Sequence, residues 1–137
     1  MIIADVMMHK EDIIENEISY KIRGCIFKVY NELGPGLLES VYEAALAFQL
    51  QQEGLSVKTQ VPVPLIYAGQ KLEVGFRIDI LVDNLVVIEV KSVEQLADVH
   101  HKQVLTYLKL YDRKLGILVN FNTDNISNSI YRKVNNL

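Results

Sequence analysis

The sequence predicts a single domain over residues 1–137, of the α/β class, with helices packed on a mixed β-sheet. Three observations support this. Half of the 137 residues are hydrophobic, which is enough for a packed core. Apolar residues follow helical spacing before residue 54, and later segments are short apolar runs typical of strands. One helical pattern lies between two of these runs. A helix that crosses over the sheet joins parallel strands, whereas the other connections are short, so the sheet is expected to be mixed.

Two helices are expected in the first part of the chain. The first covers about residues 11–33. Its apolar side chains recur every three or four positions: Ile14, Ile18, Ile22, Cys25, Ile26, Val29 and Leu33. The sequence LGPG at 33–36 ends this helix. The second helix covers about residues 38–53 and stops at Gly54.

The remaining chain predicts strands arranged around a third helix. The first strand, residues 55–69, contains Pro62 and Pro64, which place it at an edge of the sheet or in a bulge. The other expected elements are a second strand at 70–82, a third at 85–92, a helix at 97–112 with Asp98 as N-cap, a fourth strand at 115–121 and a short final strand at 128–134.

Composition excludes several classes of protein. No apolar run reaches the ~20 residues of a membrane helix, and the first residues lack the basic region of a signal peptide. Cys25 is the only cysteine, so no internal disulfide forms and a cytoplasmic setting is expected. The net charge is −3, whereas proteins that bind nucleic acid by charge alone are usually basic. Nucleic-acid binding would therefore need a local patch or bound metal cations.

Three charged residues interrupt the second and third strands, in the segment GFRIDILVDNLVVIEVKS at 75–92. Glu89 and Lys91 are two residues apart and share a face of their strand. Asp79 lies opposite Glu89 only if the strands are joined by a three-residue loop at 83–85 or contain a bulge. A two-residue turn would pair Asp79 with Ile88 and put the two carboxylates on opposite faces.

A charge inside a sheet is costly unless it is paired or bound to a metal. Two carboxylates on one face, Asp79 and Glu89, form a hard-oxygen site suited to Mg²⁺ or Mn²⁺. A neighbouring lysine, Lys91, can orient a water or stabilise charge on a phosphate. The alternative is a partly buried ion-pair network with no chemistry.

Two further patterns flank these strands. Gly36, Glu39 and Tyr42 form a G-x-x-E-x-x-Y sequence that puts Glu39 and Tyr42 on one helix face. Gln103 and Tyr107 share a face of the third helix, with His100 one turn earlier. Each pattern alone also has a structural interpretation. The first could be an ordinary acid at a helix N-terminus beside a half-buried tyrosine, and the second could be polar residues that face solvent.

Taken together, these motifs resemble the PD-(D/E)xK nuclease superfamily and specifically its GxxExxY family. The resemblance runs from about residue 18 to 121. The superfamily core is α-β-β-β-α-β, the restriction-endonuclease-like order, to which the helix at 11–33 is an N-terminal addition. The motif aspartate would be Asp79, and the (D/E)xK pair Glu89 and Lys91. One departure is Ile78, which stands where the superfamily name has proline.

The resemblance implies a metal-dependent nuclease with nucleic acid, DNA rather than RNA, as its partner. Asp79 and Glu89 would hold Mg²⁺ or Mn²⁺ together with the carbonyl of Val90, and Glu39 would complete the shell directly or through water. Lys91 would position the attacking water. Gln103 and Tyr107 would brace Lys91 or a phosphate of the substrate.

Two other hypotheses remain open from the sequence. One is a module without enzymatic activity that keeps the nuclease fold to bind nucleic acid or protein. The other is a nuclease that needs a partner subunit, or dimerisation, to supply a basic surface. Residues that could form a local basic patch, or be ordinary solvated charges, are Lys58, Lys71, Arg77 and Lys102.

Overall fold

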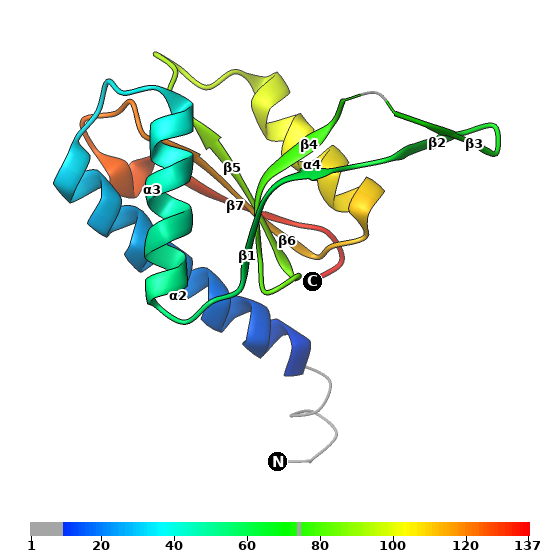
Figure 1. Ribbon diagram of the computed structural model, residues 1–137, viewed down its shortest axis with the longest axis horizontal. Helices are drawn as coiled ribbons and strands as arrows, with labels where there is room; N and C mark the ends of the chain where they lie inside the picture. Colours follow the sequence, from blue (N-terminus) through cyan, green and yellow to red (C-terminus); the bar gives the residue numbers. More distant parts are fainter. Residues whose placement is uncertain (1–9, 74) are drawn as a thin grey trace.

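A computed structural model describes residues 10–73 and 75–137 (Figure 1). Its main feature is a five-stranded sheet of order β1-β4-β5-β6-β7, in which only the β5–β6 pair is parallel. The elements are α2 (Lys10–Leu33), α3 (Glu39–Gln52), β1 (Val57–Pro62), β2 (Leu65–Tyr67), β3 (Gln70–Leu72), β4 (Arg77–Val82), β5 (Val86–Lys91), α4 (Asp98–Tyr111), β6 (Leu115–Asn120), η1 (Ile126–Asn128) and β7 (Ile130–Val134). The predicted mixed sheet, with a helix added before the core, is confirmed.

Helices α2 and α3 cover one face of the sheet because each has an apolar stripe. In α3 the buried side chains Tyr42, Leu46 and Leu50 are spaced four residues apart. They pack with the stripe of α2 and with residues of β4, β5 and β6 into the larger core. Within the described part of the chain, neither these helices nor α4 is long and apolar enough to cross a membrane.

Helix α4 covers the other face and crosses between the parallel strands β5 and β6. Its residues Val104 and Leu108 are fully buried. Gly116 of β6 lies directly beneath them, where an added Cβ would come within 2.8 Å of Val104 Cγ1. The predicted N-cap was wrong, because Ala97 occupies that position and Asp98 is the first helical residue. His100 Nδ1 instead accepts a hydrogen bond from the Ala97 amide at 3.0 Å.

The β4–β5 hairpin has the register on which the site prediction depends. Val82 pairs with Val86, which leaves the three residues of 83–85 as the loop. Asp83 and Asn84 both have positive φ, as a tight hairpin turn requires, and Leu85 is the extra residue. In an antiparallel pair, each step back along one strand is matched by a step forward along the other. Asp79 therefore lies opposite Glu89. The three-residue loop is confirmed.

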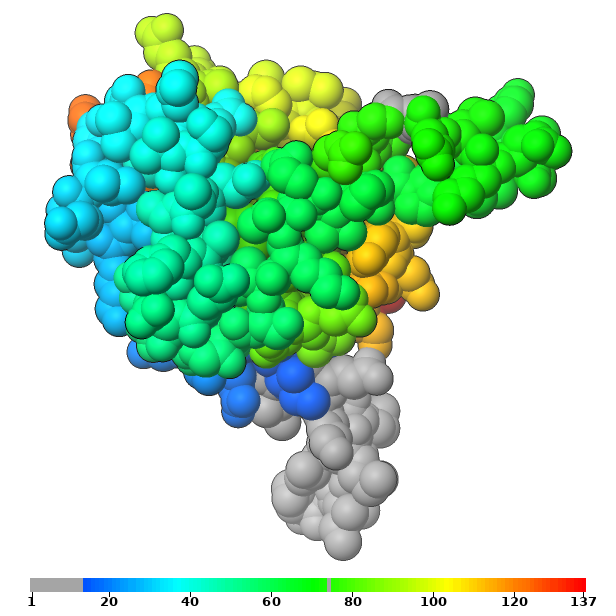
Figure 2. All heavy atoms as spheres, in the orientation of Figure 1, coloured from blue at the N-terminus to red at the C-terminus, as the bar shows by residue number. Residues whose placement is uncertain are grey.

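The long strands predicted at 55–69 and 70–82 were wrong in one respect, because each is broken in two. Strand β1 ends at Pro62, and Pro64 also lacks the N–H needed for a ladder. On the returning chain Gly75 has a φ of +79°. The segment between these breaks forms the separate β2–β3 hairpin, which projects from the body of the protein (Figures 1 and 2). Strand β1 is at a sheet edge, as its prolines predicted.

Candidate active site

The candidate site begins where strands β4 and β5 separate. Their ladder of backbone hydrogen bonds ends at the pair Ile80–Ile88. Beyond this pair, backbone amides donate to carboxyl side chains and not to backbone carbonyls. The Asp79 amide donates to Glu89 Oε2 at 3.1 Å. The Val90 amide donates to Asp79 Oδ2 at 2.9 Å. The register therefore brings the two predicted carboxylates together in a fork between the strands.

The Glu89 carboxyl group has the most perturbed environment in this fork. Only 2% of the residue is exposed. Burial, and then the negative charge of Asp79, raise its pKa to about 9, while the opposing effect of Lys91 is smaller. A buried acid beside a second acid, with hard oxygen donors, fits a divalent cation, which would replace the missing positive charge.

A cavity of about 160 Å³ opens from Asp79 toward helix α3. Glu39 lines it but is exposed, whereas Glu43, one turn later, is half-buried. Gln60 joins Glu43 to Asp79: its Nε2 lies 2.7 Å from Glu43 Oε1 and 3.4 Å from Asp79 Oδ1. Burial raises the pKa of Glu43, Gln60 lowers it, and the Asp79 charge raises it again.

Sequence reasoning missed both Glu43 and Gln60. The position of Glu43, four residues after Glu39, was a signal that it shares the same helix face. For Gln60 there was no signal, because it is an exposed residue of an edge strand. Its φ of +53° is unusual for a non-glycine residue, and its side-chain amide reaches both Glu43 and Asp79.

Tyr42 has a structural role that explains its place in the G-x-x-E-x-x-Y sequence. Its buried hydroxyl donates to the Gly34 carbonyl at 2.5 Å and accepts from the Leu37 amide at 3.1 Å. The Leu37 carbonyl in turn accepts from Ser92 Oγ at 2.5 Å. These bonds fix the loop before α3 against the end of β5 and so position Glu39 beside the site.

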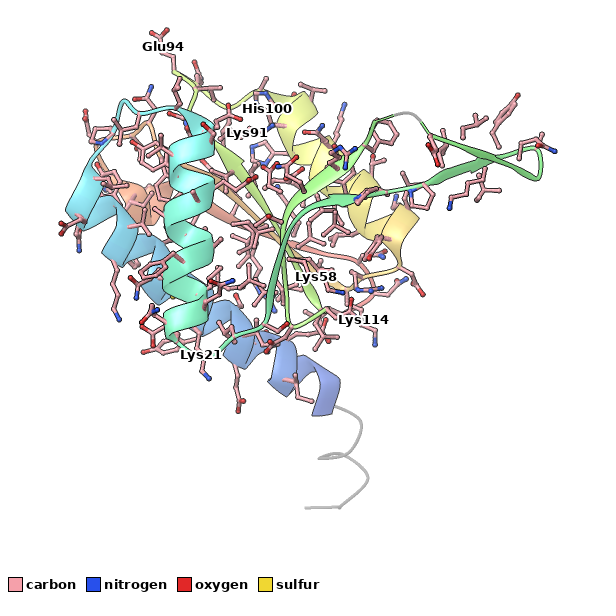
Figure 3. The ribbon with its side chains drawn as sticks, in the orientation of Figure 1. Lys21, Lys58, Lys91, Glu94, His100 and Lys114 are labelled. Atoms are coloured by element: carbon pink, nitrogen blue, oxygen red, sulfur yellow. The ribbon has the colours of Figure 1, made fainter. Side chains whose placement is uncertain are left out.

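Lys91, Gln103 and Tyr107 line a second cavity, of about 470 Å³, on the α4 side of the sheet. Gln103 Nε2 donates to the Tyr107 hydroxyl at 3.0 Å. Burial and the charges of Glu89 and Asp79 raise the pKa of Tyr107, and Gln103 lowers it. Figure 3 shows Lys91 at the end of β5, near His100 of the same cavity.

The predicted residues therefore form two groups on either side of the fork. Asp79 and Glu39 line the cavity toward α3, and Lys91, Gln103 and Tyr107 line the one toward α4. Buried Glu89 lies between them. In residues 10–73 and 75–137 no three His, Cys, Asp or Glu side chains converge closely enough to hold one metal ion. Glu39 in particular does not converge directly with Asp79 and Glu89 on one point.

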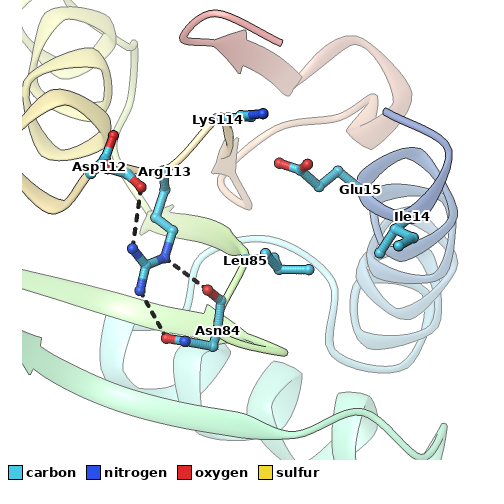
Figure 4. Close-up of a pocket in the computed structure, with 7 residues that line it drawn as sticks. All are labelled: Ile14, Glu15, Asn84, Leu85, Asp112, Arg113 and Lys114. Atoms are coloured by element: carbon cyan, nitrogen blue, oxygen red, sulfur yellow. Dashed lines mark hydrogen bonds between the residues drawn. The ribbon is translucent and has the colours of Figure 1, made fainter. Parts of the chain in front are cut away.

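A third cavity, of about 410 Å³, lies at the turn end of β4 and β5 and contains none of the predicted site residues (Figure 4). Arg113 crosses it. Its guanidinium donates to the Asn84 carbonyl at 2.8 Å and to Asn84 Oδ1 at 2.9 Å. Another of its bonds goes to the Asp112 carbonyl. The arginine ties the β4–β5 turn to the end of α4, which is a structural function.

The fold and the acid pair define a restriction-endonuclease-like class of protein. A family model described as PD-(D/E)XK nuclease superfamily matches residues 16–133, and the chain belongs to that superfamily. Among solved structures, the crystal structure of SSO0001 is similar, with 28% identity and a TM-score of 0.56. That match covers 72% of this chain and 51% of the other, so it spans about half of SSO0001. No curated protein matches significantly.

Proposed function

We propose that this protein is a nuclease that uses Mg²⁺ or Mn²⁺ to hydrolyse phosphodiester bonds in nucleic acid, specifically DNA. The observation that carries the proposal is the fork in which Asp79 and Glu89 lie side by side. Superfamily membership gives it a nuclease context. The Glu89 carboxyl group is buried beside Asp79, so a bound cation would compensate the charge that it gains on ionisation.

Each predicted residue has a role in this proposal. Asp79, Glu89 and the Val90 carbonyl would hold the metal, with Glu39 reaching it through water. A divalent cation supplies charge neutralisation on the phosphate and a lower pKa for water. Lys91 would orient the attacking water from the neighbouring cavity.

Gln103 and Tyr107 would brace the substrate phosphate on the far side of Lys91. Their mutual hydrogen bond leaves the second Gln103 N–H free to point at an anion. The two side chains line the same cavity as Lys91, which is the observation that supports a shared role.

A cleavage assay tests the proposal. The parent and Lys91→Ala proteins are incubated with labelled single-stranded, duplex and branched DNA and with RNA, each with Mg²⁺, Mn²⁺ or EDTA. We expect metal-dependent cutting of DNA that Lys91→Ala reduces by at least ~100-fold. Equal cutting by Asp79→Ala, Glu89→Ala and the parent would refute the assigned site.

A second candidate function is a nucleic-acid- or protein-binding module without activity. The observation that favours it is the absence, among the described residues, of a third acid convergent on the fork. Calorimetric titration with Mn²⁺ separates the two functions. Heat that Asp79→Asn abolishes supports the nuclease, and no heat in the parent supports the module.

The proposal also covers the family, the cellular location and the assembly of the protein. The Gly36–Glu39–Tyr42 pattern supports assignment to the GxxExxY family within the superfamily. The lone buried Cys25 supports a cytoplasmic location. The net charge of −3 supports a homodimer or partner subunit that adds basic surface, which light scattering with and without DNA would detect.

A further inference from the structure

The β2–β3 hairpin, residues 65–72, has features of a binding arm. Its strands pair only with each other and stand away from the main sheet (Figures 1 and 2). Ile66 is 61% exposed and Tyr67 is 69% exposed. An isolated two-stranded hairpin is marginally stable in water, and grouped exposed apolar side chains mark interaction surfaces. The arm therefore presents apolar and aromatic surface to an external partner.

The base of the arm connects to the candidate active site through Phe76. A cavity of about 200 Å³ at this base is lined by Phe76, Lys71 and Arg77, among others. Phe76 also lines the larger cavity that holds Lys91. Its ring contacts that of Tyr107, with the two centroids 5.9 Å apart and tilted by 57°. The two cavities thus adjoin the same half-buried aromatic ring.

Positive charge is concentrated along this path although the chain as a whole is acidic. The charged residues that line the two cavities, His100 aside, are Lys71, Arg77, Lys91, Lys102 and one acid, Glu73. The net charge of the whole chain is −3. A local cationic path that contains the half-buried Phe76 ring and starts at the arm with the exposed Tyr67 ring is complementary to a phosphate backbone with accessible bases. Lys58, at the other end of β1, lies outside the path.

We propose that the arm and these two cavities bind a single strand of nucleic acid and lead it to Lys91. Lys71 and Arg77 contact its phosphates, and Tyr67 and Phe76 stack on its bases. A single strand is favoured over a duplex because only unpaired bases offer a face to these rings. This inference rests on the proposed nuclease function, since it names the form of the substrate.

Binding of a labelled strand in EDTA tests the inference apart from cleavage. Fluorescence anisotropy is measured for a fluorescein-labelled DNA strand of about 20 nucleotides, a length that exceeds common single-strand site sizes. The arm variants are Tyr67→Ala and the double variant Lys71→Ala/Arg77→Ala, which pairs a residue of the arm with one of β4 at its base; all three positions are exposed. The matched control is Lys21→Ala/Lys58→Ala, which removes the same charge elsewhere (Figure 3).

We expect the arm double variant to bind about tenfold more weakly and its salt slope to fall by about 1.4, because each phosphate contact contributes ~0.7 on single strands. Tyr67→Ala is expected to weaken binding at least about fivefold through lost stacking. The control pair is expected to change affinity by less than about twofold. Circular dichroism melts verify that all variants are folded.

Three results would overturn the inference: arm variants that bind like the parent, a parent that binds no single strand, or a parent that prefers duplex. Dimerisation of the parent that Tyr67→Ala abolishes, without any effect on DNA affinity, would assign the arm to a second copy of the chain. A parent that binds strands through the arm but cuts none with either metal would refute the nuclease and leave the arm assignment intact.

Discussion

The carboxyl groups of Asp79 and Glu89 each accept a hydrogen bond from the backbone of the other residue's strand. The Asp79 amide donates to the Glu89 carboxyl group, and the amide of the residue after Glu89 donates to the Asp79 carboxyl group. Two acids are thereby held together, and within residues 10–73 and 75–137 neither is hydrogen-bonded to a cationic side chain. Such an arrangement is costly in the absence of a counter-ion.

Glu89→Gln is expected to stabilise the metal-free protein at neutral pH. The folded-state pKa of Glu89 is raised from 4.5 to about 9, so its contribution to stability is complete below about pH 4.5 and is lost as the pH rises through 9. At pH 7 the variant avoids a cost of up to about 3 kcal/mol, at 1.36 kcal/mol per pKa unit. Thermal melts in EDTA from pH 5 to 9 measure this, and a parent at least as stable as the variant at pH 8 contradicts it.

Mn²⁺ binding is expected to release a proton and to tighten as the pH rises. Glu89 is protonated in the metal-free protein below about pH 9, and a ligating carboxylate must be ionised. The apparent affinity is expected to rise by up to about tenfold per pH unit below that value. Calorimetry in two buffers of different ionisation enthalpy measures the proton. In Asp79→Asn the binding heat disappears, and a pH-independent affinity in the parent would exclude Glu89 as a ligand.

The register of the acid pair could be predicted because apolar alternation and loop length fix it. Once 83–85 is a three-residue loop, Asp79 and Glu89 must lie level. Gln60 could not be predicted, because a positive φ in a strand is imposed by surrounding structure and not by local preference. The arm was missed because its residues have strand character throughout. Only Pro62, Pro64 and Gly75 interrupt the two predicted strands, and sequence does not show in which direction a broken strand continues.

Tyr42→Phe is expected to destabilise the protein by about 1–2 kcal/mol, because the partly buried Gly34 carbonyl and the Leu37 amide lose their partner. The ring itself is kept, including its parallel stack on Phe121 at 4.4 Å. Tyr20→Phe is the matched control, since Tyr20 is 80% exposed. Urea unfolding gives both free energies. Equal values for the two variants would remove the structural role assigned to the Tyr42 hydroxyl.

Gly116→Ala is expected to destabilise the protein by about 1–3 kcal/mol through overpacking. The new methyl group would lie 2.8 Å from Val104 and 3.3 Å from Leu108, so α4 would have to move off the sheet. Gly24→Ala in α2 is the control, because nothing lies within 4 Å of its added Cβ. There, the gain in helix propensity is expected to stabilise by up to ~1 kcal/mol. A Gly116→Ala protein that unfolds at the parent's urea midpoint would contradict the close packing of α4.

Substitutions at Gln60 separate its backbone strain from its hydrogen bonds. Both Gln60→Ala and Gln60→Gly remove the amide that joins Glu43 to Asp79, but only glycine accepts a φ of +53° without cost. Gln60→Gly is therefore expected to be more stable than Gln60→Ala by about 1 kcal/mol. Urea unfolding in EDTA measures the difference. If the two variants unfold at the same midpoint, the left-handed conformation is not maintained without the amide, and Gln60 is held in place by its contacts with the two carboxylates.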